Sequence, residues 1–337
     1  MIGAAGTGER EHGMRRRAAL RGTAAAAVAL GLAVVFPVTA GAAGEVAFTI
    51  KDSRIAENSG MARDTTNKVY WTINDSGAPG VVYGVDSSGK VKGTLRFNAF
   101  PVDAEAVAWR KDRLYVGDIG DNDEKRKTIR VYYFDDPKPD DQVRTYRAYD
   151  FRYPDGAHDA ETLLVTPAGV LYVATKEAQG GLYRAPEKPS REGVNKLTRV
   201  KDVPATLTDG VILPGGKEIA YLTYGKLLVV DGTSGQVVAS EDITDVAQAE
   251  ALTLSLDGKS LLVGGEGKNA KVVSTAIPGA AASASPSASS DPGSEEDPED
   301  TAAVPVARQR GTYLAVGLAG VVAVVAGVVV AVVRRPG

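Results

Sequence analysis

The chain of 337 residues contains no cysteine and only two histidines, His12 and His158. The lack of cysteine excludes a disulfide scaffold, a thiolate nucleophile and zinc sites built on sulfur. The scarcity of histidine excludes most catalysis that depends on an imidazole. A net charge of -3 argues against a nucleic-acid partner, because proteins that bind nucleic acids present basic surfaces. Hydrophobic residues make up 44% of the chain, which excludes wholesale disorder and is enough for a substantial core.

Residues 1–42 have the features of a signal peptide. A basic stretch precedes an apolar run that is too short to span a bilayer, and small residues then offer a cleavage site. The pair Arg16 and Arg17 loosely fits a twin-arginine signal, so general and twin-arginine export both remain open. Met14 stands directly before the arginines and is an alternative start to Met1.

The C-terminal end predicts a single-span membrane anchor. Residues 312–333 include an uninterrupted uncharged run, about 30 Å long as a helix, and arginines follow at once in the tail 334–337. The positive-inside rule makes this tail cytoplasmic and everything upstream extracytoplasmic, at the cell membrane. Small residues recur every four positions in the helix and favour a weak helix-mediated dimer. Residues 278–311, rich in Ala, Ser, Pro and acidic residues, are expected to form an extended stalk.

The region 43–277 repeats one pattern five times. Each unit begins with a polar residue, continues through a short apolar run, a Gly, Pro or Asp turn and a second apolar run. Successive units are spaced by 46, 56, 48 and 41 residues when they are counted from Ser59, Glu105, Glu161, Asp209 and Glu250. Short β-rich runs with this period are typical of the blades of a β-propeller.

Each unit continues with two further strand candidates, which gives the four strands of a complete blade. The fifth unit lacks its last strand, whereas the run 46–50 has no unit of its own. Adding this N-terminal strand to the fifth blade would close the ring and remove exposed edges. The sequence therefore predicts an all-β protein, a five-bladed β-propeller closed by an N-terminal strand, with six blades as the alternative and one C-terminal transmembrane helix.

Three segments carry a family resemblance: Asn74 to Gly77, Gly117 to Asn122 and Asp159 to Leu163. Their sequences resemble those of secreted, membrane-anchored actinobacterial β-propeller proteins, which are broadly related to TolB-like and phytase- or esterase-like propellers. The second unit departs from the pattern, since Asp103 to Ala106 stands where Asp-Trp-Glu-Asp is expected. The resemblance implies a secreted propeller and says little about activity.

Acidic residues recur where the units are expected to meet. In a propeller the innermost strand starts on the face where the second strand ends, so these positions share one rim around the axis. Like charges so close together are costly unless they are protonated or neutralised by a cation. Oxygen ligands without cysteine favour Ca²⁺ or Mg²⁺ as the cofactor. The predicted metal ligands are Glu105, Glu161, Asp209, Glu250, Asp103, Asp159 and Asp118. The alternative is that these carboxylates accept backbone N–H groups and shape turns.

His158 is the candidate catalytic residue. It adjoins Asp159 and Glu161, so it could serve as a general base or as a further metal ligand. The alternative is a surface histidine in a loop between blades. No Gly-x-Ser-x-Gly elbow accompanies it.

Two functions follow from this sequence. The first is an extracytoplasmic binding module that holds an envelope protein or a small ligand at its acidic rim. The second is a metal-dependent hydrolase of phosphate esters or lactones, in which a cation polarises the substrate. That reading needs basic contacts for the substrate, and only Lys176 and Arg126 are available near the rim.

Overall fold

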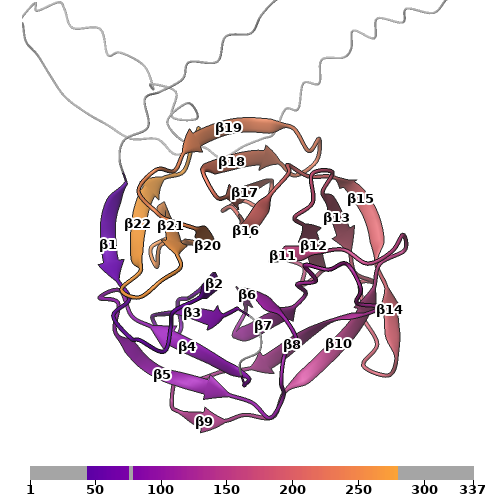
Figure 1. The fold of residues 1–337 in the computed structure, drawn as a ribbon, viewed down its shortest axis with the longest axis horizontal. Coiled ribbons are helices and arrows are strands. Elements are labelled where there is room, and N and C mark those ends of the chain that lie inside the picture. Colours follow the sequence, from indigo (N-terminus) through magenta and orange to yellow (C-terminus); the bar gives the residue numbers. More distant parts are fainter. Residues whose placement is uncertain (1–43, 76–78, 280–337) are drawn as a thin grey trace, which may run out of the picture. The chain divides into compact units, whose positions relative to one another are not determined.

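A computed structural model describes residues 44–75 and 79–279, and these form five β-sheets arranged around a central axis (Figure 1). The predicted five-bladed all-β propeller is confirmed, and the six-bladed alternative is wrong. No helix able to cross a membrane is found in these ranges. The predicted signal peptide (1–42), transmembrane helix (312–333) and tail (334–337) lie outside the described residues, as does the stalk beyond residue 279.

The described ranges contain 22 strands. In chain order these are β1 (Glu45–Thr49), β2 (Asn58–Asp64), β3 (Val69–Asn74), β4 (Val81–Val85), β5 (Val91–Arg96), β6 (Ala104–Arg110), β7 (Arg113–Asp118), β8 (Ile129–Asp135), β9 (Gln142–Val143), β10 (Arg147–Arg152), β11 (Ala160–Val165), β12 (Leu171–Thr175), β13 (Gly181–Arg184), β14 (Val194–Lys196), β15 (Thr198–Asp202), β16 (Leu207–Ile212), β17 (Glu218–Thr223), β18 (Lys226–Asp231), β19 (Val237–Asp242), β20 (Ala249–Leu254), β21 (Ser260–Gly265) and β22 (Lys271–Ala276).

Each blade is an antiparallel meander whose first strand lies nearest the axis (Figure 1). Blade I is β2-β3-β4-β5, blade II is β6-β7-β8-β10, blade III is β11-β12-β13-β15 and blade IV is β16-β17-β18-β19. Blade V is β20-β21-β22 completed by β1, which pairs antiparallel with β22 from Glu45 opposite Ser274 to Thr49 opposite Lys271. The predicted closure by the N-terminal strand is therefore confirmed.

Two short strands outside the four-strand pattern explain the longer second and third units. Strand β9 lies in the connection from β8 to β10 and pairs in parallel with β5 of blade I. Strand β14 lies in the connection from β13 to β15 and pairs in parallel with β10 of blade II. Each long connection thus covers the outer edge of the preceding blade, which leaves fewer backbone groups unpaired at that edge.

The core lies between neighbouring blades. Between blades I and II, for example, Leu95 and Leu114 are fully buried in one apolar cluster with Tyr132. Aromatic residues contribute to this core, since Trp71 is 0% and Tyr221 is 1% exposed. Burial of side chains of this size contributes about 1.5 to 3 kcal/mol each, so packing between blades holds the ring together.

All five innermost strands carry a β-bulge at the same place, within the first three residues of the strand at the acidic rim. The residue left unpaired by each bulge is Gly60, Glu105, Glu161, Thr208 or Glu250. A bulge re-aims its side chain relative to the regular alternation of the strand. The register corrects one expectation: Ser59 and Asp209 are not equivalent to the three glutamates but lie one residue before and one residue after the bulge.

Candidate metal centre at the acidic rim

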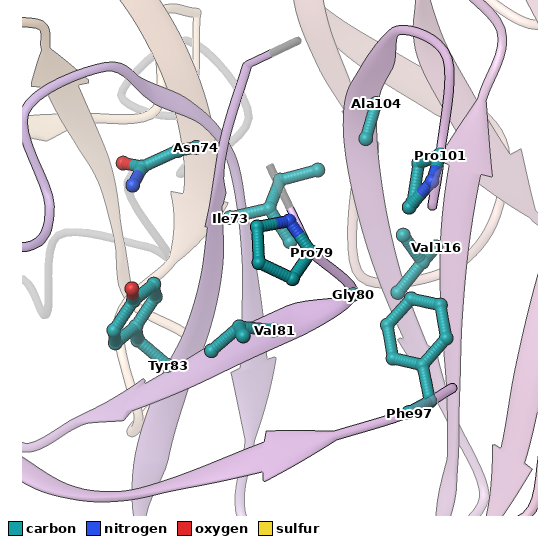
Figure 2. Close-up of a pocket in the computed structure, with 10 residues that line it drawn as sticks. All are labelled: Ile73, Asn74, Pro79, Gly80, Val81, Tyr83, Phe97, Pro101, Ala104 and Val116. Carbon is teal, nitrogen blue, oxygen red and sulfur yellow. The ribbon is translucent and has the colours of Figure 1, made fainter. Parts of the chain in front are cut away.

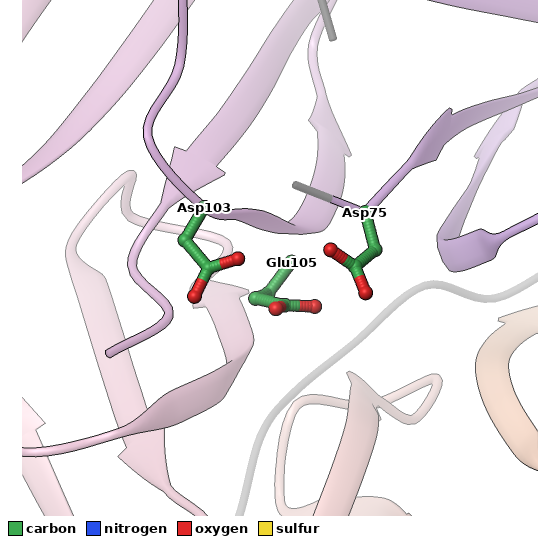
Figure 3. A group of neighbouring side chains, drawn as sticks. All are labelled: Asp75, Asp103 and Glu105. Atoms are coloured by element: carbon green, nitrogen blue, oxygen red, sulfur yellow. The ribbon is translucent and has the colours of Figure 1, made fainter. Parts of the chain in front are cut away.

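Three carboxylates converge where blades I and II meet at the rim (Figure 3). Asp75 directly follows β3, Asp103 directly precedes β6, and Glu105 is the bulge residue of β6. One oxygen from each lies within 4.8 Å of the others. A calcium ion bound at about 2.4 Å places opposite ligand oxygens at twice that distance, so this spacing fits one shared cation. We call Asp75, Asp103 and Glu105 the carboxylate cluster.

Two small residues allow the carboxylate cluster to form. Ser59 donates its hydroxyl hydrogen to Glu105 Oε2 at 2.8 Å and orients this side chain toward blade I. Gly120 leaves room for the side chains of Asp103 and Glu105, because a Cβ there would lie 2.5 Å from Asp103 Oδ2 and 2.8 Å from Glu105 Cγ. The loop after β7 thus approaches the carboxylates more closely than any residue with a side chain would permit.

Burial makes the carboxylate cluster costly to ionise. Glu105 is only 5% exposed, and this burial, with the charge of Glu161, raises its pKa to about 10. Burial and the charges of Asp75 and Asp159 also raise the pKa of Asp103, although Arg126 opposes the rise. Asp75 Oδ1 is buried and has no hydrogen-bond partner among the described residues. These groups would be neutralised by protons or by a divalent cation.

Two predicted ligands, Asp118 and Asp159, are engaged in the neighbouring loop. Asp118 pairs with Arg126 at 2.8 Å and accepts the backbone N–H of Asp103 at 3.0 Å. Asp159 accepts the backbone N–H of Asp121 at 2.8 Å. Both carboxylates therefore shape the loops that hold the carboxylate cluster.

The remaining three predicted ligands have separate partners. Glu161 pairs with Lys176; burial raises the pKa of this glutamate to about 7, and the lysine opposes the rise. Asp209 is 1% exposed and accepts the backbone N–H groups of Gly210 at 2.7 Å and Leu252 at 2.6 Å. The second bond joins blade IV to blade V. Glu250 lies beside Glu266, and burial together with this like charge raises its pKa to about 8.

His158, the predicted catalytic residue, lies in a network of its own. Its Nδ1 is 2.9 Å from Glu177 Oε1, and its Nε2 is 3.0 Å from Asp155 Oδ1 and 2.9 Å from the hydroxyl of Tyr183. None of the hydrogen bonds found in residues 44–75 and 79–279 links it to the carboxylate cluster. The network ties the loop before β11 to the loop after β12, which is a structural use of this histidine.

Asp75 was not among the predicted ligands, although it directly follows the second strand of its unit. Its place directly after a second strand, on the face where the innermost strands begin, is the signal by which it could have been included. Gly120 was missed as well. Only the approach of its loop to two carboxylates in space shows why this position lacks a side chain.

An apolar pocket of about 100 Å³ lies next to the carboxylate cluster, between blades I and II (Figure 2). Its lining includes Asn74 and Ala104, which are the sequence neighbours of Asp75 and of both Asp103 and Glu105. Tyr83, Phe97 and Val116 supply much of the remaining wall. The pocket and the carboxylate cluster thus share the ends of β3 and β6, although none of the three carboxylates lines the pocket.

The chain matches no protein-family model and no curated protein. Among solved structures it is similar to a gluconolactonase from Xanthomonas campestris, with 14% identity over 68% of this chain and 89% of the other and a TM-score of 0.43. It is also similar to the β-propeller domain of Cps50 (Swd1) from Myceliophteria thermophila, with 17% identity over 64% of each chain and a TM-score of 0.38. Hydrazine synthase of Kuenenia stuttgartiensis matches with 17% identity over 63% of this chain and 56% of the other, at a TM-score of 0.36. Similarity at this level carries no argument about function.

Proposed function

We propose that the protein is an extracytoplasmic, membrane-anchored binding module whose acidic rim holds Ca²⁺ or Mg²⁺ at Asp75, Asp103 and Glu105. The observation that carries this proposal is the convergence of three carboxylate oxygens within 4.8 Å of one another, one of them from a side chain only 5% exposed. The unpartnered, buried Asp75 Oδ1 supports it independently. The membrane anchor rests on the sequence alone.

The ligand of this module is expected to combine an oxygen-bearing anionic group with an apolar part. A cation held by three carboxylates retains positions for oxygen atoms of a ligand, since Ca²⁺ takes six to eight. The adjoining apolar pocket would receive the rest of that ligand. An envelope protein could present the same chemistry through an acidic and an apolar side chain.

A metal-dependent hydrolase of phosphate esters or lactones is the second candidate, and the pocket beside the carboxylate cluster favours it. A cation there could polarise a bound ester and lower the pKa of a bound water. The basic residues expected to contact a substrate, Arg126 and Lys176, are however both paired, with Asp118 and Glu161. We therefore favour the binding module over the hydrolase.

The decisive experiment is thermal unfolding of the metal-stripped full-length chain in non-ionic detergent, with Ca²⁺ or Mg²⁺ added and bound metal counted. At a concentration one hundred times Kd, a ligand that binds only the folded state contributes about 2.7 kcal/mol. For a domain of this size the unfolding midpoint should then rise by about 5 to 11 °C. Glu105→Gln and Asp75→Asn should each abolish most of this rise.

Asp123→Asn is the matched control. It removes one carboxylate charge from the same rim, but the Asp123 side chain is 75% exposed and lies outside the carboxylate cluster. It should leave the rise intact. A wild-type chain that binds no metal and shows no shift would overturn the cation site and both candidate functions. If metal binds, turnover of lactone and phosphoester substrates that is lost in Glu105→Gln would favour the hydrolase over the binding module.

A further inference from the structure

A basic groove lies on the face opposite the carboxylate cluster. Its volume is about 500 Å³, and it runs between blades II and III. We use the name basic groove for the depression whose cationic and tyrosine lining residues are Arg110, Lys111, Arg113, Lys188, Tyr115 and Tyr149, and which Asp135 and Glu187 also line.

The strand directions place this groove away from the acidic rim. Strand β6 begins at the carboxylate cluster and ends at Arg110, so its hairpin turn to β7 emerges on the other face. The equivalent turn of blade III, at Ala168 and Gly169, forms the facing wall. The guanidinium of Arg110 lies 3.8 Å from where a Cβ of Gly169 would be, so it reaches from one blade to the next.

Positive charge exceeds negative charge in the basic groove. Its two acidic residues are already paired: Asp135 with Arg113 at 2.6 Å and with Arg147, and Glu187 with Arg184 at 2.9 Å. Arg110, Lys111 and Lys188 take part in no ion pair found in the described part of the chain. Three cations thus face one depression whose carboxylates have other partners, which concentrates positive potential there.

The wall that carries these cations is firmly held. Lys111 and Asp112 form the two-residue hairpin turn with φ of 45° and 57°, a conformation that favours Asn and Gly. Asp112 is fixed by the hydroxyl of Thr66 at 2.6 Å and by the backbone N–H of Asp136 at 2.7 Å. These contacts hold the backbone of the turn, and with it the base of the Lys111 side chain, in place.

Aromatic residues order the outer part of the basic groove. The ring of Tyr149 stacks on Tyr133 with centroids 4.9 Å apart, and the guanidinium carbon of Arg113 lies 4.7 Å from the Tyr133 ring centroid. Burial raises the pKa of Tyr149 to about 12, so its hydroxyl stays neutral and can donate a hydrogen bond to an anion. Preorganised donors of this kind lower the entropy cost of holding a ligand.

We propose that the basic groove binds a small multivalent oxyanion, such as a sugar or short chain with two or more phosphate or carboxylate groups. Its volume lies within the range of sites for small organic ligands. Arginine and lysine recognise phosphate and carboxylate oxygens alike through charge-assisted hydrogen bonds. The site is separate from the carboxylate cluster and does not depend on a bound cation.

Isothermal titration of the full-length chain with tripolyphosphate and with trigalacturonate tests this proposal. The tighter of the two ligands identifies the preferred anionic group. Lys111→Gln combined with Lys188→Gln should weaken binding at least about tenfold, since one lost charge-assisted hydrogen bond is worth about that factor. Lys188→Glu, which alters only the loop between β13 and β14, should do the same without touching the strained turn.

Lys217→Gln combined with Lys259→Gln is the matched control. Both lysines are exposed, and both lie in turns between the first and second strands of blades IV and V, on the same face. Binding should be unchanged in this variant. The proposal is overturned if neither ligand binds at millimolar concentration, or if the control weakens binding as much as the groove variants do, because the attraction would then be general to the face.

Discussion

At the scale of single residues, Gly120 is the position on which the carboxylate cluster most directly depends. A methyl group there would lie 2.5 Å from Asp103 Oδ2, closer than real Cβ contacts permit. Gly120→Ala must therefore move Asp103 or the loop itself, and overpacking of this kind costs about 1 to 3 kcal/mol. We expect Ca²⁺ affinity, measured by isothermal titration, to fall at least about tenfold, which corresponds to about 1.4 kcal/mol.

Gly225→Ala is the control for this change. Gly225 follows a second strand on the same rim, and a Cβ there would meet nothing within 4 Å. Its affinity for Ca²⁺ should match that of the wild type. If Gly120→Ala bound Ca²⁺ as tightly as Gly225→Ala does, Asp103 and Glu105 would not be the ligands.

The acidic positions were predictable from the sequence, but their individual roles were not. The repeat correctly placed Glu105, Glu161 and Glu250 at equivalent positions, because each follows the start of an innermost strand. Their chemistry is decided by partners distant in sequence: Lys176 pairs with Glu161, and Glu266 lies beside Glu250. No spacing rule within one repeat reveals which neighbour will face which carboxylate.

At the scale of secondary-structure elements, strand β1 closes the ring, and Phe48 is its main apolar contact. Phe48 is 7% exposed and stacks on Tyr70 of blade I with ring centroids 5.5 Å apart. Phe48→Ala should lower the free energy of unfolding by about 3 to 5 kcal/mol, as for other large buried aromatic residues. Urea denaturation measures this loss, and hydrogen exchange should accelerate first in β22, which pairs with β1.

Val46→Ala serves as the comparison within the same strand. Val46 is 47% exposed, so its truncation should change the free energy of unfolding by less than about 0.5 kcal/mol. Equal losses in the two variants would mean that β1 contributes through its backbone pairing alone. Unchanged exchange in β22 of Phe48→Ala would contradict the closing role of the side chain.

The regular elements of this fold follow from its repeat, whereas its irregular ones do not. Four strands per unit and the unpaired N-terminal strand could be read from apolar runs and turn residues. Strands β9 and β14 have only two and three residues and are defined by parallel pairing with the preceding blade. The bulges were also invisible, since a one-residue offset in pairing leaves no mark on a short apolar run. Because of the bulge at Thr208, Asp209 is not equivalent to Glu105, Glu161 and Glu250, from which the repeat was counted.

At the scale of the whole molecule, charge is divided between two faces. Four of the five innermost strands carry a buried carboxylate near their start, and the turn after β6 presents cations without an ion pair on the opposite face. The buried carboxylates share one consequence. Because burial raises the pKa values of Glu105, Glu161 and Glu250 to about 10, 7 and 8, the folded chain holds protons that the unfolded chain has released.

The stability of the metal-free chain should therefore fall as the pH rises. For Glu250 the pKa is 4.5 when unfolded and about 8 when folded, so the folded state binds more protons between these values. Its stabilising contribution is complete below about pH 4.5 and is lost as the pH rises through about 8. Urea midpoints of the metal-stripped chain, measured from pH 5 to pH 9, should decline across this window.

Glu250→Gln should make the decline shallower, and so should Glu266→Gln, because it removes the like charge beside Glu250. Added Ca²⁺ should stabilise the chain more at the alkaline end, where protons no longer neutralise the rim. A decline that is identical in Glu250→Gln and the wild type would show that this carboxylate is already ionised in the folded protein.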